Sequence, residues 1–171
     1  MERFFTQSRT VANIKKTYHR LAMQFHPDLG GDTATMQELN AQYLAALQRC
    51  DGETITDEQG QKHTYNYRTE REQEIIDFLD KLIGSGALQP DVECWLIGYW
   101  VWVQGNTRPV KDILKAVGCS WHGKRACWYW HPAQGRTHYN ANASLDDLAA
   151  AYGASAVIAK DKDRPDSRIA A

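Results

Sequence analysis

The chain has 171 residues, of which 24% are charged, and a formal net charge of −1 at pH 7. This length suits one ordinary domain or two small ones, and the near-neutral charge indicates neither a nucleic-acid nor a membrane partner. No run of about 18 apolar residues predicts a membrane span, and the N-terminus has no signal-peptide core. Four irregularly spaced cysteines are typical of reduced core residues, so we expect a cytoplasmic protein.

Two amphipathic stretches near the N-terminus predict a pair of helices. In the first stretch, apolar side chains recur at helical spacing at Ile14, Tyr18, Leu21 and Phe25. The second stretch repeats this spacing at Met36, Leu39, Tyr43 and Leu47. Pro27 disfavours the α conformation in His26, so the first helix must end there. The two helices are therefore expected to form an antiparallel hairpin whose tip carries His26-Pro27-Asp28.

In these residues the sequence resembles the J-domain family, the DnaJ-type co-chaperones. The likeness runs from Ile14 to about Leu47 and is strongest from Arg20 to Met23 and from Phe25 to Asp28. The resemblance implies that this region binds a DnaK-type (heat-shock-protein-70) chaperone and stimulates its ATP hydrolysis. The residues to which it gives chaperone-binding roles are His26, Pro27, Asp28, Lys15, Lys16, His19 and Arg20.

The exposed side of the first helix is expected to be basic. Four basic residues lie off the apolar stripe: Lys15, Lys16, His19 and Arg20. No carboxylate occurs between Arg3 and Asp28. Such a face attracts an acidic partner and binds it less tightly as salt rises. The alternative interpretation is an ordinary solvated surface.

The middle of the chain predicts a β-hairpin followed by an acidic helix. Residues rich in Thr, Ile and Tyr flank the turn cluster at 57–60, and a helical apolar period then extends over residues 69–83 and ends at Gly84. Acidic residues lie opposite that apolar stripe. The helix is expected either to connect two parts of the chain or to fold back and mask Lys15, Lys16 and Arg20.

The C-terminal half contains all six tryptophans, within residues 92–131. Its pattern predicts a small ββαβ module with a helix at 109–117, followed by a short helix that begins after Ser144. The module is loosely similar to those of short J-type proteins of phages and mobile elements. The expected fold is α+β in four parts: residues 1–49 as the J-type helical domain, 50–89 as the β-hairpin and acidic helix, 90–155 as the Trp-rich module, and 156–171 as a flexible tail.

A module of this size is not expected to bury six indole rings. Exposed rings beside cations are typical of sites for single-stranded nucleic acid, where rings stack on bases and cations contact phosphates. The candidate residues for nucleic-acid or target binding are Trp100, Trp102, Trp128, Trp130, Lys124 and Arg125. An apolar peptide or client protein is an alternative partner, and a Trp-rich core with a solvated basic rim is the alternative without a partner.

Other kinds of site are less favoured by the sequence. Cys119, His122, Cys127 and His131 are zinc-type ligands, but they would lie on both faces of a hairpin, so no metal is expected. No nucleophile accompanies His26 and Asp28, so neither catalysis nor a cofactor is expected. The patterns favour a co-chaperone that directs a DnaK-type chaperone to a specific target. The alternatives are a nucleic-acid- or protein-binding adaptor of a mobile element that uses the hairpin as a scaffold, and an inhibitor of a host protein.

Overall fold

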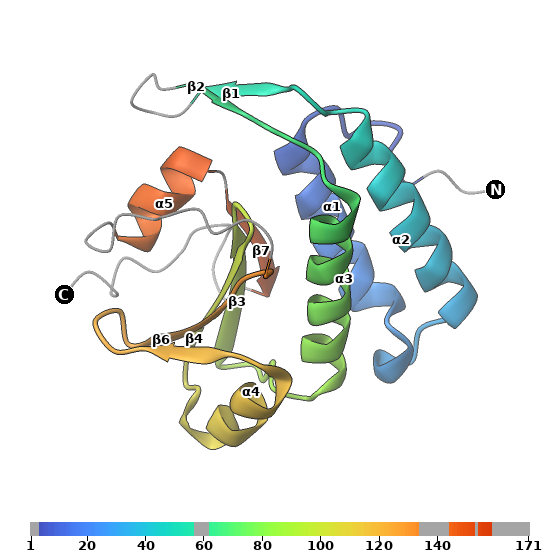
Figure 1. Ribbon diagram of the computed structural model, residues 1–171. Coiled ribbons are helices and arrows are strands. Elements are labelled where there is room, and N and C mark those ends of the chain that lie inside the picture. The colour runs from blue at the N-terminus through green and yellow to red at the C-terminus, as the bar shows by residue number, and fades with distance from the viewer. Residues whose placement is uncertain (1–3, 57–61, 134–143, 153, 159–171) are drawn as a thin grey trace.

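The computed structural model describes residues 4–56, 62–133, 144–152 and 154–158 (Figure 1). Its helices are α1 (Val11–Phe25), α2 (Thr33–Gln48), α3 (Thr69–Gly84), α4 (Lys111–Val117) and α5 (Leu145–Tyr152). The strands are β1 (Thr54–Thr56), β2 (Lys62–Thr64), β3 (Val92–Ile97), β4 (Trp100–Gly105), β5 (Ser120–His122), β6 (Cys127–Trp130) and β7 (Ala154–Ile158). Two short 3-10 helices, η1 (Pro27–Leu29) and η2 (Arg108–Val110), complete the described elements. The predicted α+β class is confirmed.

Helices α1 and α2 form the expected antiparallel hairpin. Thr10 caps α1 by accepting a hydrogen bond from the Asn13 amide at 3.3 Å. At the other end, His26 has an extended backbone (ψ 128°), as a residue before proline favours, and α1 ends. The stacked rings of Tyr18 and Tyr43, 4.0 Å apart and both fully buried, join the two helices.

The β-hairpin and the acidic helix are also found where the sequence predicts them. β1 pairs antiparallel with β2, and the predicted turn at 57–60 lies outside the described residues. α3 packs its apolar stripe inward, including Ile75, Leu79 and Leu82, each less than 2% exposed. This helix lies beside α1 and α2, on the side that faces the sheet (Figure 1).

The main sheet has five antiparallel strands in the order β5-β6-β4-β3-β7. The predicted ββαβ order includes β3, β4, α4 and β6 but lacks β5 and β7. Neither missing strand has a clear pattern, because β5 has three residues and β7 is mainly small residues. The expectation of a flexible tail from residue 156 is therefore wrong for residues 156–158, which belong to β7.

Both faces of the main sheet are covered. Helices α1 and α3 lie on one face, and α5 lies on the other (Figure 1). On the helical face, Val101, Val103 and Trp128 join an apolar cluster that includes Tyr18 of α1 and Ile76 of α3. This cluster draws on residues from both sides of the predicted domain boundaries at 49/50 and 89/90.

A second apolar cluster fills the face under α5. Trp95, Trp102 and Cys127 of the sheet pack there with Leu145 and Leu148, as expected for a short helix completing the Trp-rich core. Ser144 and Asp147 cap this helix reciprocally, with the Ser144 amide donating to Asp147 at 2.9 Å and the Asp147 amide donating to Ser144 at 3.1 Å.

Candidate functional site

The His-Pro-Asp loop lies at the tip of the α1–α2 hairpin and forms η1. Its backbone is closed by amides of Leu29 and Gly31, which donate to the His26 carbonyl at 3.0 and 2.9 Å. Pro27 and Asp28 are exposed, and the Asp28 side chain keeps 65% of its surface in solvent. The tip therefore presents one proline and one carboxylate to solvent.

The His26 ring points inward and is only 2% exposed. The Asp28 amide donates to its Nδ1 at 3.2 Å, so the ring proton must be on Nε2. Nε2 lies 3.1 Å from the main-chain carbonyl of Asp80 and 3.0 Å from its Oδ1. His26 thus links the loop to the last turns of α3, a contact that sequence reasoning missed because it joins elements far apart in the chain.

The expectation of a wholly exposed basic face on α1 is wrong. Lys16 and Arg20 are exposed, but Lys15 and His19 keep only 7% and 1% of their surface in solvent. The sequence pattern assumed that α1 packs on one side only. In the structure α1 packs against α2 on one side and against β7 and neighbouring elements on another, so two of the four side chains are buried.

Lys15 is held in the interior by backbone and aromatic groups. Its Nζ donates to the Gly98 carbonyl in the β3–β4 turn at 2.9 Å and lies 5.0 Å from the centre of the Tyr99 ring. Burial lowers the pKa of this ammonium, and the charge of Glu72 opposes that effect. The groups that enclose Lys15 thus include the β3–β4 turn, and Lys16 and Arg20 stay exposed, so the hypothesis that α3 masks these two residues is wrong.

Around Glu72, which is fully buried, α3 places a small polar network. Tyr65 donates its hydroxyl to Glu72 Oε1 at 2.9 Å, and Arg71 forms an ion pair with the same oxygen at 3.5 Å. The Arg71 guanidinium also lies 3.6 Å from the centre of the Tyr99 ring. We call Lys15, Tyr65, Arg71, Glu72 and Tyr99 the buried polar cluster.

His19 lies next to this cluster without a polar contact of its own. Neither ring nitrogen has a hydrogen-bond partner among the residues that the structure describes. Burial, together with the positive charge of Lys15, lowers the pKa of His19 to about 3. The ring is therefore neutral at physiological pH and acts as a core side chain.

The predicted nucleic-acid or target site on the tryptophans is largely buried. Trp102, Trp128 and Arg125 keep 1%, 5% and 6% of their surface exposed, which contradicts their assignment as exposed stacking and phosphate-binding residues. Trp130 is half-buried and stacks on Phe78 of α3 at 4.1 Å. The sequence argument considered a module alone, whereas helices from both ends of the chain cover the sheet.

The remaining candidates lie toward the surface. Trp100 is half-buried and contacts Trp102 and His131, with ring centres 5.6 and 4.4 Å apart, and Lys124 is exposed. Trp121 was not among the candidates, yet it is the most exposed of the six tryptophans, with 50% of its surface in solvent. Its place on the short strand β5 has no sequence signal that distinguishes it from the other five.

The four zinc-type residues do not form a ligand set. His122 accepts a hydrogen bond from the Arg125 amide at 3.2 Å, and burial raises the pKa of Cys119 and of Cys127 to about 12. Within the described ranges, no group of three or more His, Cys, Asp or Glu residues is placed to hold a metal ion.

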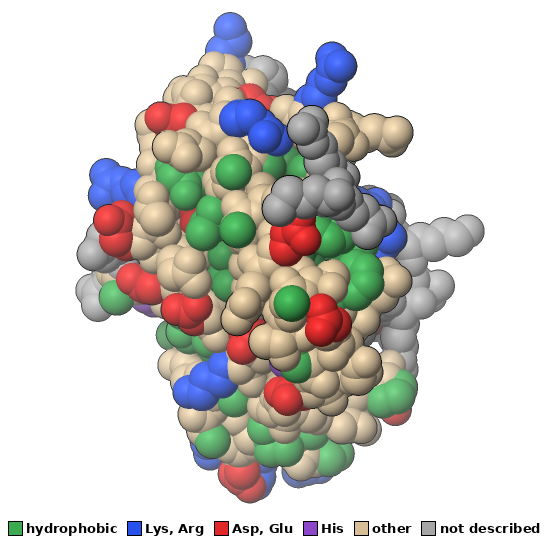
Figure 2. Space-filling view, turned by 90° about the vertical axis from the view of Figure 1, so that its right-hand side faces the viewer, with side chains coloured by type: hydrophobic (Ala, Val, Ile, Leu, Met, Phe, Trp, Pro, Cys, Tyr) green, Lys and Arg blue, Asp and Glu red, His purple; other side chains and the backbone are tan. Residues whose placement is uncertain are grey.

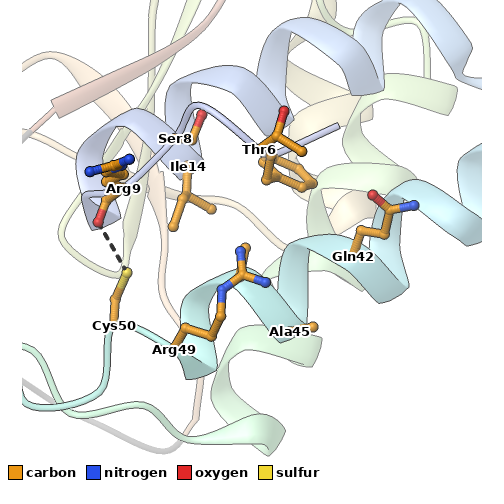
Figure 3. A pocket seen from close by; sticks show the side chains of 10 residues that line it. Thr6, Ser8, Arg9, Ile14, Gln42, Ala45, Arg49 and Cys50 are labelled. Carbon is orange, nitrogen blue, oxygen red and sulfur yellow. Dashed lines mark hydrogen bonds between the residues drawn. The ribbon is translucent and has the colours of Figure 1, made fainter. Parts of the chain in front are cut away.

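A cavity of about 720 Å³ lies between the N-terminal segment and α2 (Figure 3). Phe5 and Ile14 contribute apolar walls, and Figure 3 shows Arg9 and Cys50 together at one side, with the Cys50 thiol 3.6 Å from the Arg9 carbonyl, while Arg49 extends from α2 into the middle. The cavity lies at the start of α1 and the end of α2, away from the His-Pro-Asp loop. It is therefore separate from the candidate site.

Charges on the side that carries α2 are mixed (Figure 2). Carboxylates are scattered over its centre, whereas Lys and Arg side chains lie mostly near its edges. A continuous basic surface is thus absent from the described residues visible on this side.

Within the described chain, no helix has the length and apolar character needed to cross a bilayer.

The chain is similar to the small t antigen of budgerigar fledgling disease virus. The two are 36% identical over 64 residues, which cover 35% of this chain and 43% of the viral protein. The chain therefore spans less than half the length of this relative. No family model matches the chain, and no solved structure matches it either. The viral relative supports the relation to J domains only loosely.

Proposed function

We propose that this protein is a cytoplasmic J-type co-chaperone. It binds a DnaK-type chaperone through the His-Pro-Asp loop, stimulates its ATP hydrolysis and directs it to a specific target held by the C-terminal half. The observation that carries the proposal is the exposure of Pro27 and Asp28 at the tip of a rigid helical hairpin.

The exposed basic residues of α1 extend this contact. Lys16 and Arg20 are four residues apart and so lie on one row of the helix, which continues through Gln24 toward the loop. Leu29, 52% exposed, adds an apolar side chain next to Asp28. Together these residues offer a partner two cations for its acidic groups, a carboxylate for a hydrogen-bond donor or a cation, and an apolar contact. Lys15 and His19 take no part, because they are buried.

The test is single-turnover ATP hydrolysis by a DnaK-type chaperone with the parent protein and its Asp28→Asn variant. Asp28 is exposed, so the amide should remove the loop charge and leave the fold intact. We expect the parent to accelerate hydrolysis on the order of tenfold, a common size for coupling between binding sites. We expect the variant to lose most of that effect.

The matched control is Asp112→Asn, the same chemical change on an exposed residue of α4, which belongs neither to the hairpin nor to α3. It should stimulate like the parent. Equal activity of parent and Asp28→Asn would contradict the proposed role of the loop. Tight binding without stimulation would instead favour an inhibitor of the chaperone.

An adaptor that binds single-stranded nucleic acid is a second candidate function, and one observation favours it. Trp121 and Lys124 are both exposed in the β5–β6 hairpin, where a ring and a cation lie close in the chain. Titration with a single-stranded oligonucleotide at low salt, followed by tryptophan fluorescence, should then report binding that Trp121→Phe weakens. Absence of binding by the parent would remove this candidate.

A further inference from the structure

The last turns of α3 pack against the His-Pro-Asp loop and support it. Asp80 reaches the buried His26 Nε2 through both its carbonyl, at 3.1 Å, and its carboxylate, at 3.0 Å. One turn later, Gly84 lies against Asp28, so closely that a Cβ added at Gly84 would lie 2.2 Å from Asp28 Oδ2. Two residues of α3 thus contact the loop at its two ionisable side chains.

The His26 ring connects α3 to the exposed tip of the loop. Its side chain is 2% exposed, so a partner cannot reach it without displacing α3. Its Nδ1 meanwhile accepts the Asp28 amide at 3.2 Å, which fixes the backbone of the residue that is exposed. In this geometry His26 is an internal link, and Pro27 and Asp28 are the groups that a partner contacts.

We propose that Asp80 and Gly84 are positioning residues, which hold Asp28 in the orientation that the chaperone recognises. This inference rests on the proposed function of the loop. It also implies that α3, which follows the hairpin in the chain, contributes to the docking site by positioning the loop. The opposite idea, that α3 holds the loop in order to mask it, predicts that loosening α3 increases stimulation.

Gly84 allows a test that separates position from stability. Its φ is not in the left-handed region, so alanine fits its backbone and is favoured at a helical position. The atoms nearest to the added methyl group would be those of a flexible, exposed carboxylate and the Cε1 atom of the His26 ring, 3.4 Å away. Gly84→Ala should therefore turn the Asp28 carboxylate aside without unfolding the protein.

The experiment measures single-turnover stimulation and thermal unfolding for the parent, Gly84→Ala and Asp80→Ala. We expect Gly84→Ala to lower stimulation about tenfold, because small misplacements of a contacting group have large effects on rate, while its Tm is no lower than that of the parent. Asp80→Ala should lose less, since the main-chain carbonyl still accepts from His26. Gly123→Ala, where a Cβ meets nothing within 4 Å, and Asp112→Ala, on an exposed residue of α4, serve as controls and should match the parent.

Two further readouts make the outcome decisive. In the first, the maximal rate of ATP hydrolysis and the concentration of Gly84→Ala that gives half of it should both differ from those of the parent. In the second, the carbon-13 NMR chemical shift of the Asp28 carboxyl group should change as well. A merely structural role of Gly84 would leave that chemical shift unaltered. Stimulation by the parent that both α3 variants retain would overturn this inference alone. Higher stimulation by the variants would overturn it in favour of masking. No stimulation by the parent would overturn the proposed function itself.

Discussion

The two ends of α3 use charged side chains in opposite ways. Near its start, Glu72 and Arg71 are buried with Lys15 and form part of the buried polar cluster. Near its end, Asp80 keeps 54% of its side chain in solvent while it contacts His26. The first end fixes the hairpin to the rest of the molecule, and the second end shapes a loop that is exposed to solvent.

The comparison shows that a pattern of charges does not tell whether they face water. Lys15 and Lys16 are adjacent in sequence, yet one is buried and the other is exposed. A charged side chain of a helix is buried where a second element packs on its side of the helix, and it stays exposed where none does. A charge in the interior is strongly destabilising when it lacks a partner, whereas exposed charges contribute little to stability.

The largest expected effect on stability is that of Glu72→Ala. It removes the acceptor of Tyr65 and leaves Lys15 and Arg71 buried without a carboxylate, so we expect a loss of about 3–5 kcal/mol in the free energy of unfolding. Urea denaturation followed by circular dichroism measures it. A loss below about 1 kcal/mol, the range of exposed pairs, would show that the cluster behaves like a surface ion pair.

A double substitution is the control for this prediction. Glu72→Gln together with Lys15→Met removes both charges and keeps the side-chain volumes, so it should cost less than the sum of the two single changes. Simple addition of the two effects would mean that Lys15 and Glu72 are not coupled, contrary to the geometry.

The next expected effect is loss of stability in acid through His19. Its folded pKa is about 3, below the 6.5 of the unfolded chain, so between these values the unfolded state binds a proton that the folded state does not. Stability should therefore fall as pH drops below 6.5, by about 3 kcal/mol at pH 4 from this group.

The variant His19→Leu isolates this contribution. Leucine fits an apolar site and has no nitrogen to leave unpaired, so the variant should be at least as stable as the parent at pH 7. Urea denaturation at pH 7 and at pH 4 measures the difference between the two proteins. An equal loss in both on acidification would contradict the prediction.

The smallest expected effect is that of Asp80→Asn on stability. The side chain is half exposed, so the change should cost less than about 1 kcal/mol in the free energy of unfolding. A Tm within a few degrees of the parent would agree with this. A large loss would mean that the two ends of α3 are alike in stabilising the fold.

Local sequence signals predicted most elements correctly. The spacing of Ile14 and Tyr18, the stop at Pro27 and the reciprocal cap at Ser144 each act within a few residues, and each is confirmed. The strands β5 and β7 were missed, because a strand of three residues and one rich in alanine show no alternation. Their existence depends on neighbours in the sheet.

The candidate site was predictable only in part. The tripeptide and its place between two helices follow from sequence, but Asp80 and Gly84 do not, since more than fifty residues separate them from His26. Burial of Trp102 and Trp128 agrees with the alternative of a Trp-rich core, which the sequence could not distinguish from an exposed site for the same reason. Their covering helices come from the two ends of the chain, and no local pattern reports such contacts.

The position of β7 has a consequence for how the molecule assembles. This strand pairs with β3 and packs against α1, so the last described strand covers the first described helix. Contacts of such long sequence separation slow folding, because the chain must close a large loop before it gains them. During synthesis, the hairpin would emerge from the ribosome with Lys15 and His19 still in water. Only the late arrival of the sheet would enclose them, and until then the nascent chain would display a more basic helix than the finished protein does.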